Sequence, residues 1–251
     1  FEYIRLVKDI MPKVFVAENV SGLIKGTAKG YFLEILAAMK AAGYKVSCRV
    51  LDAQWLGVPQ MRQRAIFIGV RNDISMEPIH PKPLQYQYTV KDVLPWIVTI
   101  GTSKGFGKAE QIDANSPYHT VGTGPQSGNG LARFVESETD ISKYAIGDEW
   151  DNIKQGEKSL RFLSLVKPDI NKACPTITQR SGSTSVAGVV HPTEKRKFTI
   201  AELKRICAFP DDFILTGTYT QQWERLGRAV PPVMMYHIAK TVRDEILCKM
   251  K

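Results

Sequence analysis

The sequence of 251 residues predicts an α/β fold, in which part of a parallel sheet is joined to a smaller, irregular, β-rich module. Three observations lead to this prediction. A continuous apolar run at residues 14–17 is typical of a strand buried on both faces of a parallel sheet. An amphipathic stretch at residues 27–42 follows, as expected for a helix packed on such a sheet. From residue 75 onward, prolines and then a segment rich in Gly, Ser, Thr and Asn end this alternation.

The first part of the chain contains the predicted helices and strands of the sheet. A helix is expected before Pro12, because apolar residues recur there with helical spacing. The helix at residues 27–42 is expected to end at Gly43, which is a common helix terminator. Two further strands are expected at residues 44–51 and 65–70. We therefore assign residues 1–74 to the sheet domain.

The remainder of the chain is predicted to leave this domain and return to it. Residues 75–195 lack strong helical periodicity and form the expected irregular, β-rich module. Thr199 and Glu202 have the spacing of a capping box, so a helix begins there. A last helix is expected after Pro232. Its buried side is predicted to consist of Met234, Ile238, Val242 and Ile246. Residues 196–251 are assigned to the returning segment.

Composition favours a polyanionic partner. The net charge is +9 and the isoelectric point is near 9.3, and neutralising phosphates releases counterions. A basic protein with no such partner has the same composition, so charge alone does not decide. No apolar run approaches the roughly 20 residues that span a bilayer, and we expect a cytoplasmic, nucleoid-associated protein without a membrane partner. The four cysteines are far apart, show no metal-ligand spacing and are interpreted as reduced and structural.

Two groups of polar residues stand where a site is expected. Glu18 and Asn19 follow the first strand, and ligands of open α/β sheets bind at the carboxyl ends of strands. The alternative interpretation is structural: Glu18 caps the turn that follows the strand, and Asn19 helps to shape it. Gln60, Arg62 and Arg64 follow later, and strand alternation would place both arginines on one face, where they could hold a phosphate and a base carbonyl. The alternative interpretation of the two arginines is a basic strand edge that only faces solvent.

Four segments occur in an order that resembles the 5-cytosine DNA methyltransferase family. They are VFVAENV (14–20), VPQMRQR (58–64), FTIAELKRICAFPDDF (198–213) and GRAVPP (227–232). Four matches in order are far less expected by chance than one. The resemblance covers both ends of the chain and implies the back half of a Rossmann-like, S-adenosylmethionine-dependent methyltransferase sheet. The middle module then stands where the family has its target recognition domain.

The resemblance implies catalytic roles for three of these residues. Carbon-5 of cytosine is a poor nucleophile, so methylation requires covalent activation at carbon-6 and stabilisation of charge on the ring. Glu18 matches the family glutamate that acts beside ring nitrogen 3, and Asn19 is its supporting neighbour. Arg64 is assigned to the base carbonyl oxygen. Arg62 is assigned to phosphate or to fixing the loop, and Gln60 to the nucleic acid.

The resemblance also implies cofactor and recognition residues. Gly227, Ala229 and Val230 are assigned to S-adenosylmethionine as backbone or packing contacts. The family usually has Asn where this chain has Arg228, which either pairs with the cofactor carboxylate or points outward. In the recognition module, Gln179, Arg180 and Ser181 are candidates for contacts in the DNA groove. An ordinary mixed-charge surface is the alternative. No metal is implied.

The resemblance therefore predicts part of an enzyme that methylates carbon-5 of a flipped cytosine in duplex DNA. No Gly-rich cofactor loop and no Pro-Cys dipeptide precede Glu18. We expect the upstream half of the same enzyme, as a missing segment or a separate chain, to supply the nucleophilic cysteine, and the isolated chain to be inactive. The alternatives are a non-catalytic DNA-binding specificity subunit and an RNA cytosine methyltransferase of the same family.

Overall fold

The computed structural model describes residues 2–24, 28–94 and 139–250, and the chain divides into two compact units. The sheet unit comprises Phe1–Leu56, Arg62–Gln85 and Met234–Lys251. The second unit comprises Gly57–Met61 and Tyr86–Val233. The expected boundaries after residues 74 and 195 differ from this division. Residues 196–233 belong to the second unit because their apolar side chains pack in its core.

The sheet unit is built on three strands in the order β1-β3-β2. They are β1 (Val14–Val20), β2 (Tyr44–Asp52) and β3 (Gln63–Arg71), close to the predicted positions. Both pairings with β3 are antiparallel, so β1 and β2 run parallel to each other with β3 reversed between them. This corrects the expectation of a parallel sheet. β1 has one neighbour within the described residues, and Phe15 is its only fully buried side chain.

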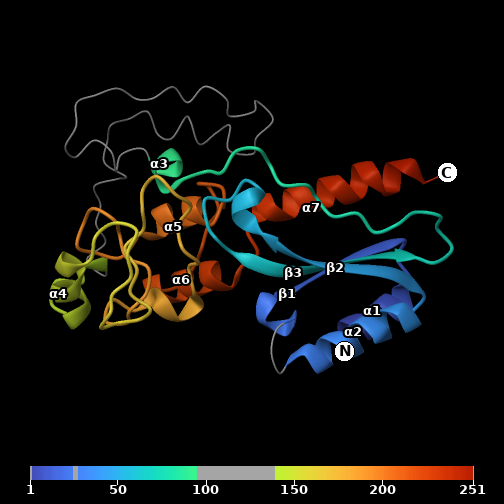
Figure 1. Ribbon diagram of the computed structural model, residues 1–251, viewed down its shortest axis with the longest axis horizontal. Coiled ribbons are helices and arrows are strands. Elements are labelled where there is room, and N and C mark those ends of the chain that lie inside the picture. Colours follow the sequence, from blue (N-terminus) through green and yellow to red (C-terminus); the bar gives the residue numbers. More distant parts are fainter. Residues whose placement is uncertain (1, 25–27, 95–138, 251) are drawn as a thin grey trace. The chain divides into compact units, whose positions relative to one another are not determined.

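Helices lie on both sides of this sheet. Helices α1 (Glu2–Ile10) and α2 (Lys29–Ala41) lie along one side, and α7 (Pro232–Glu245) lies on the opposite side (Figure 1). Phe15 and Phe67 of the strands join Met39 of α2 in one apolar cluster. The chain leaves α2 through Gly43, whose φ of 94° is a left-handed conformation that favours glycine. The predicted buried side is confirmed, since Met234, Ile238 and Val242 of α7 and Ile246 directly after it are all buried.

The second unit consists of short helices joined by irregular chain. Helices α3 (Val90–Val93), α4 (Ala145–Asn152), α5 (Ile200–Ile206) and α6 (Tyr219–Arg228) accompany a 3-10 turn, η6 (Gln179–Gly182). The described residues of this unit are irregular, as expected, but contain isolated bridges such as Val166 with Val189 in place of strands. The expected β-rich character is therefore not seen in that part. Further 3-10 turns are η1 (Ser21–Ile24), η3 (Ala53–Trp55) and η7 (Leu247–Lys249), all in the sheet unit.

Capping boxes set the starts of α3, α5 and α6, whose apolar side chains pack in the core of the second unit. Thr199 accepts from the Glu202 amide and Glu202 accepts from the Thr199 amide, which confirms the predicted start of α5. Thr218 and Gln221 form the same arrangement at α6, which the sequence analysis did not identify. Trp223 of α6 is fully buried and donates to the Thr178 carbonyl at 2.9 Å. Among the described residues, every helix is too short or too polar to traverse a bilayer.

Candidate active site and nucleic-acid interface

The carboxylate of Glu18 and the guanidinium of Arg64 form an ion pair on one face of the sheet. In the register of β1 with β3, Glu18 lies opposite Ile66 and Val20 lies opposite Arg64. The two side chains are therefore diagonal neighbours on the same face, within reach of long side chains. Arg64 Nε lies 2.7 Å from Glu18 Oε1. The strand pairing thus brings together the two residues for which the sequence predicts adjacent catalytic roles.

This ion pair is partly open to solvent. The side chain of Glu18 is 28% exposed and that of Arg64 is 13% exposed. Burial lowers the pKa of Arg64, and the charge and hydrogen bond of Glu18 oppose that shift. Arg64 Nη1 also donates to the Gln63 carbonyl at 2.8 Å. Within the described part of the chain, Arg64 Nη2 and Glu18 Oε2 have no hydrogen-bond partner, so a donor and an acceptor remain for a ligand.

Asn19 is not joined to this ion pair. Successive side chains of a strand point to opposite faces, so Asn19 faces away from Glu18 and Arg64. Its Oδ1 accepts from the Val20 amide at 2.8 Å. Such a bond shapes the local backbone as β1 ends.

Arg62 and Gln60 lie elsewhere than the sequence analysis expected. Strand β3 begins at Gln63, so Arg62 precedes it and does not share an exposed face with Arg64. The Arg62 side chain is buried, and its carbonyl accepts from the Ala53 amide at 2.9 Å. Packing of η3 against this turn therefore replaces the expected shared face of the two arginines. Of the two roles predicted for Arg62, contact with phosphate or fixing the loop, its burial favours the second.

Gln60 is buried in the second unit. Its Nε2 donates to Cys207 Sγ at 3.2 Å, and its backbone forms an isolated bridge with Cys174. On both sides of this bridge, Cys174 N donates to the Pro59 carbonyl at 2.9 Å and Met61 N donates to the Cys174 carbonyl at 2.8 Å. These bonds hold the Gly57–Met61 segment in the second unit. The assignment of the Gln60 side chain to the nucleic acid is therefore corrected to a packing role.

The cysteines are free, and the three best enclosed lie in apolar surroundings. Burial raises the pKa of the Cys48 thiol to about 11. Burial, with the neighbouring Cys207, raises the pKa of Cys174 well above its usual value. A raised pKa disfavours the thiolate, which is the nucleophilic form. This supports the structural interpretation of Cys48 and Cys174.

Gly227 lies inside helix α6 and not in an open turn. A Cβ at this position would lie 2.5 Å from the Gln179 nitrogen and 2.7 Å from the Thr178 carbonyl carbon. Glycine is required there because α6 and η6 approach each other closely. Ala229 ends the helix, with its amide donating to the Arg225 carbonyl at 3.0 Å, and Val230 follows it half-buried.

The surroundings of Gly227 do not form a cradle for S-adenosylmethionine. The space beside its α-carbon is filled by backbone of the same unit. Arg228 points outward, donating from Nε to Gln179 Oε1 at 2.6 Å and from Nη2 to Glu224. Of the two interpretations of Arg228, pairing with the cofactor carboxylate or pointing outward, these contacts support the second. In the described residues, no cluster of metal-ligating side chains is present.

The three predicted groove residues differ in accessibility. Gln179 and Arg180 are exposed on η6. Ser181 is buried, and its Oγ lies 2.6 Å from Thr178 Oγ1. Close packing of Gly188 on the Ser181 side chain explains this burial. Ser181 is therefore corrected to a residue that shapes η6, whereas Gln179 and Arg180 remain accessible candidates.

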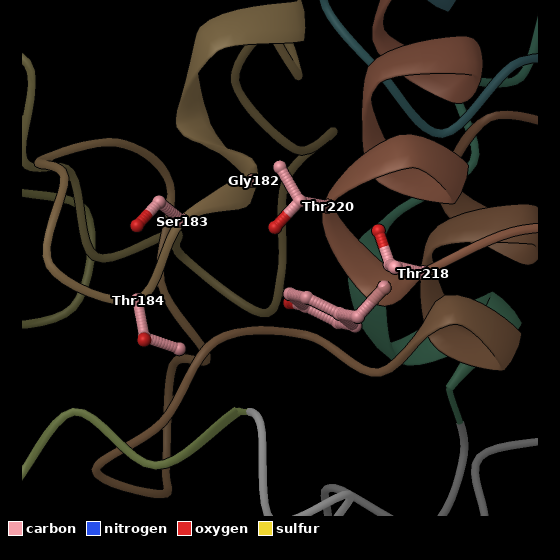
Figure 2. A pocket seen from close by; sticks show the side chains of 6 residues that line it. Gly182, Ser183, Thr184, Thr218 and Thr220 are labelled. Carbon is pink, nitrogen blue, oxygen red and sulfur yellow. The ribbon is translucent and has the colours of Figure 1, made fainter.

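A hydroxyl-lined pocket of about 210 Å³ adjoins η6. Figure 2 shows Ser183 and Thr184 on one side of it and Thr218 and Thr220, at the start of α6, on the other. Ser183 Oγ lies 3.0 Å from Ser185 Oγ, and Thr218 Oγ1 caps α6. The side chains that line the pocket carry no charge, so it suits a neutral polar group or an anion held by hydroxyls. No pattern in the sequence predicts this pocket, because its two sides are far apart in the chain.

The profile of the family described as C-5 cytosine-specific DNA methylase matches residues 1–244. The chain is 28% identical over 248 residues to the type II methyltransferase M.NgoFVII of Neisseria gonorrhoeae, covering 96% of this chain and 61% of that protein. It is 31% identical over 246 residues to M1.HphI of Haemophilus parahaemolyticus, covering 96% and 59%. The chain thus spans about three fifths of the length of these relatives.

Two solved structures have a similar fold. A prophage-encoded protein of E. coli aligns with a TM-score of 0.68 and 20% identity, covering 98% of this chain and 73% of the other. The methyltransferase EhMeth of Entamoeba histolytica aligns with a TM-score of 0.55 and 16% identity, covering 98% and 68%. At these identities the likeness establishes the fold, and the roles of individual residues rest on the site itself.

Proposed function

Because the chain belongs to the C-5 cytosine-specific DNA methylase family, we propose that it is the part of a DNA methyltransferase that holds and activates the target cytosine. The family implies S-adenosylmethionine as methyl donor and carbon-5 of cytosine in duplex DNA as acceptor. The observation that carries the proposal is the partly exposed ion pair of Glu18 and Arg64. Its unused donor and acceptor suit the hydrogen-bonding edge of a cytosine.

The chemistry of the cytosine ring assigns a role to each member of the pair. Activation requires a bond at carbon-6 and stabilisation of the charge that develops on the ring. Glu18 acts beside ring nitrogen 3 and the amino group, where a carboxyl can donate a proton or accept a hydrogen bond. Arg64 donates to the ring carbonyl oxygen. The ion pair therefore positions the two groups before the base arrives, which limits reorganisation during the reaction.

The target base has to leave the duplex to reach this pair. Its reacting atoms are inaccessible in the stack, so the proposal includes extrusion of the cytosine from the helix. Duplex DNA as partner agrees with the net charge of +9. The exposed Arg180 and Gln179 are the proposed groove contacts of the second unit.

The attacking thiolate is proposed to come from another part of the enzyme. Cys48 and Cys174 have raised pKa values, and Cys207 is buried beside Gln60. The space beside Gly227 is filled by the backbone of Thr178 and Gln179, so this glycine is not assigned to the cofactor. We accordingly propose that the isolated chain transfers no methyl group and that the upstream half of the enzyme completes the site. Radiolabelled methyl transfer by the purified chain alone would contradict this.

The decisive test compares Glu18→Gln with the parent in the longest polypeptide that carries this chain. The measurement is the rate of covalent adduct formation with duplex DNA containing 5-fluorocytosine. Loss of a general acid typically lowers a rate roughly 100- to 10,000-fold, and we expect a decrease in this range. Glu34→Gln, at an exposed position of α2, is the matched control and should leave the rate unchanged. Equal rates for the parent and Glu18→Gln would remove the proposed role of Glu18.

A further inference from the structure

The hydroxyl-lined pocket beside η6 has hydrogen-bond donors that the protein itself leaves unused. Thr184 lines one side of the pocket and Thr220, the second residue of α6, lines the other (Figure 2). Within the described residues, neither hydroxyl has a hydrogen-bond partner, and neither has the amide of Thr220. An amide in the first turn of a helix has no partner inside the helix. Two hydroxyls and one amide are therefore available to an acceptor in the pocket.

The two segments that form this pocket contain no acidic residue. One side belongs to residues 170–193 and the other to residues 213–223, and neither stretch of sequence includes Asp or Glu. The acidic residues that flank the second stretch are engaged elsewhere: Glu224 pairs with Arg228, and Asp212 lines a separate hollow. An anion in the pocket therefore meets no carboxylate from either segment.

Two exposed arginines of the same unit stand beside the pocket. Arg180 lies on η6, two residues before Gly182, which lines the pocket. In the part of the chain that the structure describes, Arg180 forms no hydrogen bond or ion pair. Arg225 is folded back along α6, with Nη1 donating to the Thr216 carbonyl and lying 3.3 Å from the position of a Cβ on Gly217. Its charge is thus held beside the start of α6.

A third cation is buried beneath the loop that forms one side of the pocket. Lys197 is fully buried, and its Nζ donates to the Val186 carbonyl at 2.8 Å. This Nζ stands 5.6 Å from the centre of the Trp223 ring, and Gly182 packs on the same tryptophan side chain. Among the described residues, no carboxylate pairs with Lys197. Burial lowers the pKa of Lys197 to about 7, and a nearby anion would stabilise its charged form.

The donors of the pocket suit a phosphodiester better than a free phosphate. A phosphate monoester carries close to two charges at neutral pH and is typically held by clustered arginines. The side chains that line this pocket are neutral. Phosphates of a DNA backbone carry one charge each and are commonly contacted by Ser and Thr hydroxyls, backbone amides and helix N-termini. The volume of about 210 Å³ leaves room for one such group.

We propose that this pocket holds one backbone phosphate of duplex DNA, with the Thr184 hydroxyl and the hydroxyl and amide of Thr220 donating to its oxygens. The proposed groove contacts Gln179 and Arg180 directly precede the pocket in η6. A phosphate held here therefore orients these two side chains toward the adjacent groove. Phosphate contacts position a protein on DNA but carry no sequence information. This inference rests on the proposed function and adds to it an anchor that is separate from base reading.

The test removes the two unused hydroxyls and keeps the side-chain volume. Thr184→Val/Thr220→Val is compared with the parent in the longest polypeptide that carries this chain. The matched control is Ser185→Ala/Thr216→Val, which removes one hydroxyl from each of the same two segments at exposed positions outside the pocket. Affinity is measured by fluorescence anisotropy for a duplex that the enzyme methylates and for a duplex that it does not methylate.

The valine variant is expected to lose about tenfold in affinity for both duplexes, because hydrogen bonds to a charged group are lost. The control should bind like the parent. Thr184→Ser/Thr220→Ser retains both hydroxyls and should also bind like the parent. Replacing one DNA phosphate at a time with a neutral methylphosphonate should identify one position that weakens the parent and leaves the valine variant unaffected.

Four results would overturn the phosphate anchor. They are equal affinity of the parent and the valine variant, a loss confined to the methylated duplex, an equal loss in the serine variant, and methylphosphonate effects that are the same for the parent and the valine variant at every position. If inorganic phosphate raises the melting temperature of the parent alone while both proteins bind DNA equally, the pocket serves free phosphate and the proposal is wrong. The proposed function fails separately, through unchanged adduct formation by Glu18→Gln.

Discussion

Each unit contains a glutamate paired with an arginine, and the two pairs are built differently. In the sheet unit, Glu18 and Arg64 come from neighbouring strands, with side chains 28% and 13% exposed. In the second unit, Glu202 and Arg196 are six residues apart in sequence, and both side chains are 3% exposed. The chemical groups are the same. The difference lies in how much of their hydrogen-bonding capacity is already used.

The buried pair forms nearly all of its hydrogen bonds within its own unit. Arg196 donates from Nη1 and Nη2 to the two carboxylate oxygens of Glu202, each at 2.8 Å. Glu202 also accepts from the Thr199 amide at 2.8 Å, and Arg196 donates to the Lys197 carbonyl and to Glu194, both at 2.9 Å. A buried charge is tolerated when it is paired and fully hydrogen-bonded. Four of the five guanidinium N–H groups and both carboxylate oxygens are thus engaged, and both side chains are 3% exposed, so this pair holds the fold.

The pair in the sheet unit has the opposite character. One short contact joins Glu18 to Arg64, and solvent reaches both side chains. A partly exposed ion pair contributes little stability. We therefore attribute this pair to the chemistry of the proposed site and not to holding the fold. The comparison indicates that unused bonding capacity, rather than the ion pair itself, distinguishes a binding pair from a structural one.

The largest expected effect on stability comes from removing one partner of the buried pair. Arg196→Leu leaves the Glu202 carboxylate buried without its guanidinium, which typically costs about 3–5 kcal/mol. Urea denaturation should show a correspondingly lower free energy of unfolding. Arg196→Leu/Glu202→Leu removes both charges and should recover part of this loss, although it also removes the capping bond of Thr199. A decrease below about 1 kcal/mol for the single variant would show that the pair is not structural.

The buried pair should also make stability sensitive to acid. Burial alone would raise the pKa of Glu202, but the hydrogen bonds from Arg196, with the His191 ring nitrogen 3.6 Å away, lower it well below its usual value. The unfolded chain therefore binds this proton more readily than the folded protein. The stabilisation is fully present above the unfolded pKa of about 4.3 and is lost as the pH falls below it, by at most about 1.4 kcal/mol per pH unit.

This pH dependence is measured by urea denaturation between pH 3 and pH 6. Glu202→Gln should flatten the acid side of the stability profile. Thr199→Ala is the control, because it removes the capping hydroxyl at a cost of about 1 kcal/mol and retains the carboxylate. Parallel acid slopes for Glu202→Gln and the parent would assign the acid sensitivity to other groups.

The spacing of residues in the sequence predicts those features of the fold that depend on residues close together in the chain. The Thr199 and Glu202 capping box and the buried side of α7 were confirmed because both depend on residues three or four positions apart. Helix α6 was missed although Tyr219, Trp223 and Leu226 have the spacing of a buried face. The spacing thus predicts a helix there, and the motif GRAVPP (227–232) overlaps only its last residues.

Tertiary packing decided the rest of the candidate site. The positions of Arg62, Gln60 and Ser181 depend on partners distant in sequence, such as Ala53, Cys207 and Gly188. No periodicity in the sequence reports those contacts. Strand alternation predicts which face Arg64 occupies, but it presumed that the strand already included Arg62, which lies one residue before β3. The pairing of Arg196 with Glu202 could likewise not be predicted, because it forms when an irregular loop folds back onto α5.

The smallest expected effect on stability concerns the sheet-unit pair, and it provides the sharpest test of the comparison. Arg64→Lys keeps the positive charge but loses the planar fork that can bond two acceptors at once. Because the pair is partly exposed, the free energy of unfolding should change by less than about 1 kcal/mol. In the longest polypeptide that carries this chain, losing one hydrogen bond to a charged group should lower the rate of methyl transfer roughly 10- to 100-fold.

Arg5→Lys is the matched control for this variant. Arg5 pairs with Glu2 and Asp9 on the exposed side of α1, so its replacement should alter neither stability nor methyl transfer. Steady-state kinetics with duplex DNA separate two outcomes for Arg64→Lys. A lower kcat with little change in KM would mean that Arg64 acts on the activated ring. A higher KM alone would mean that Arg64 binds the base equally strongly before and during the reaction. If Arg64→Lys instead destabilises the protein as strongly as Arg196→Leu, both pairs hold the fold and exposure does not distinguish them.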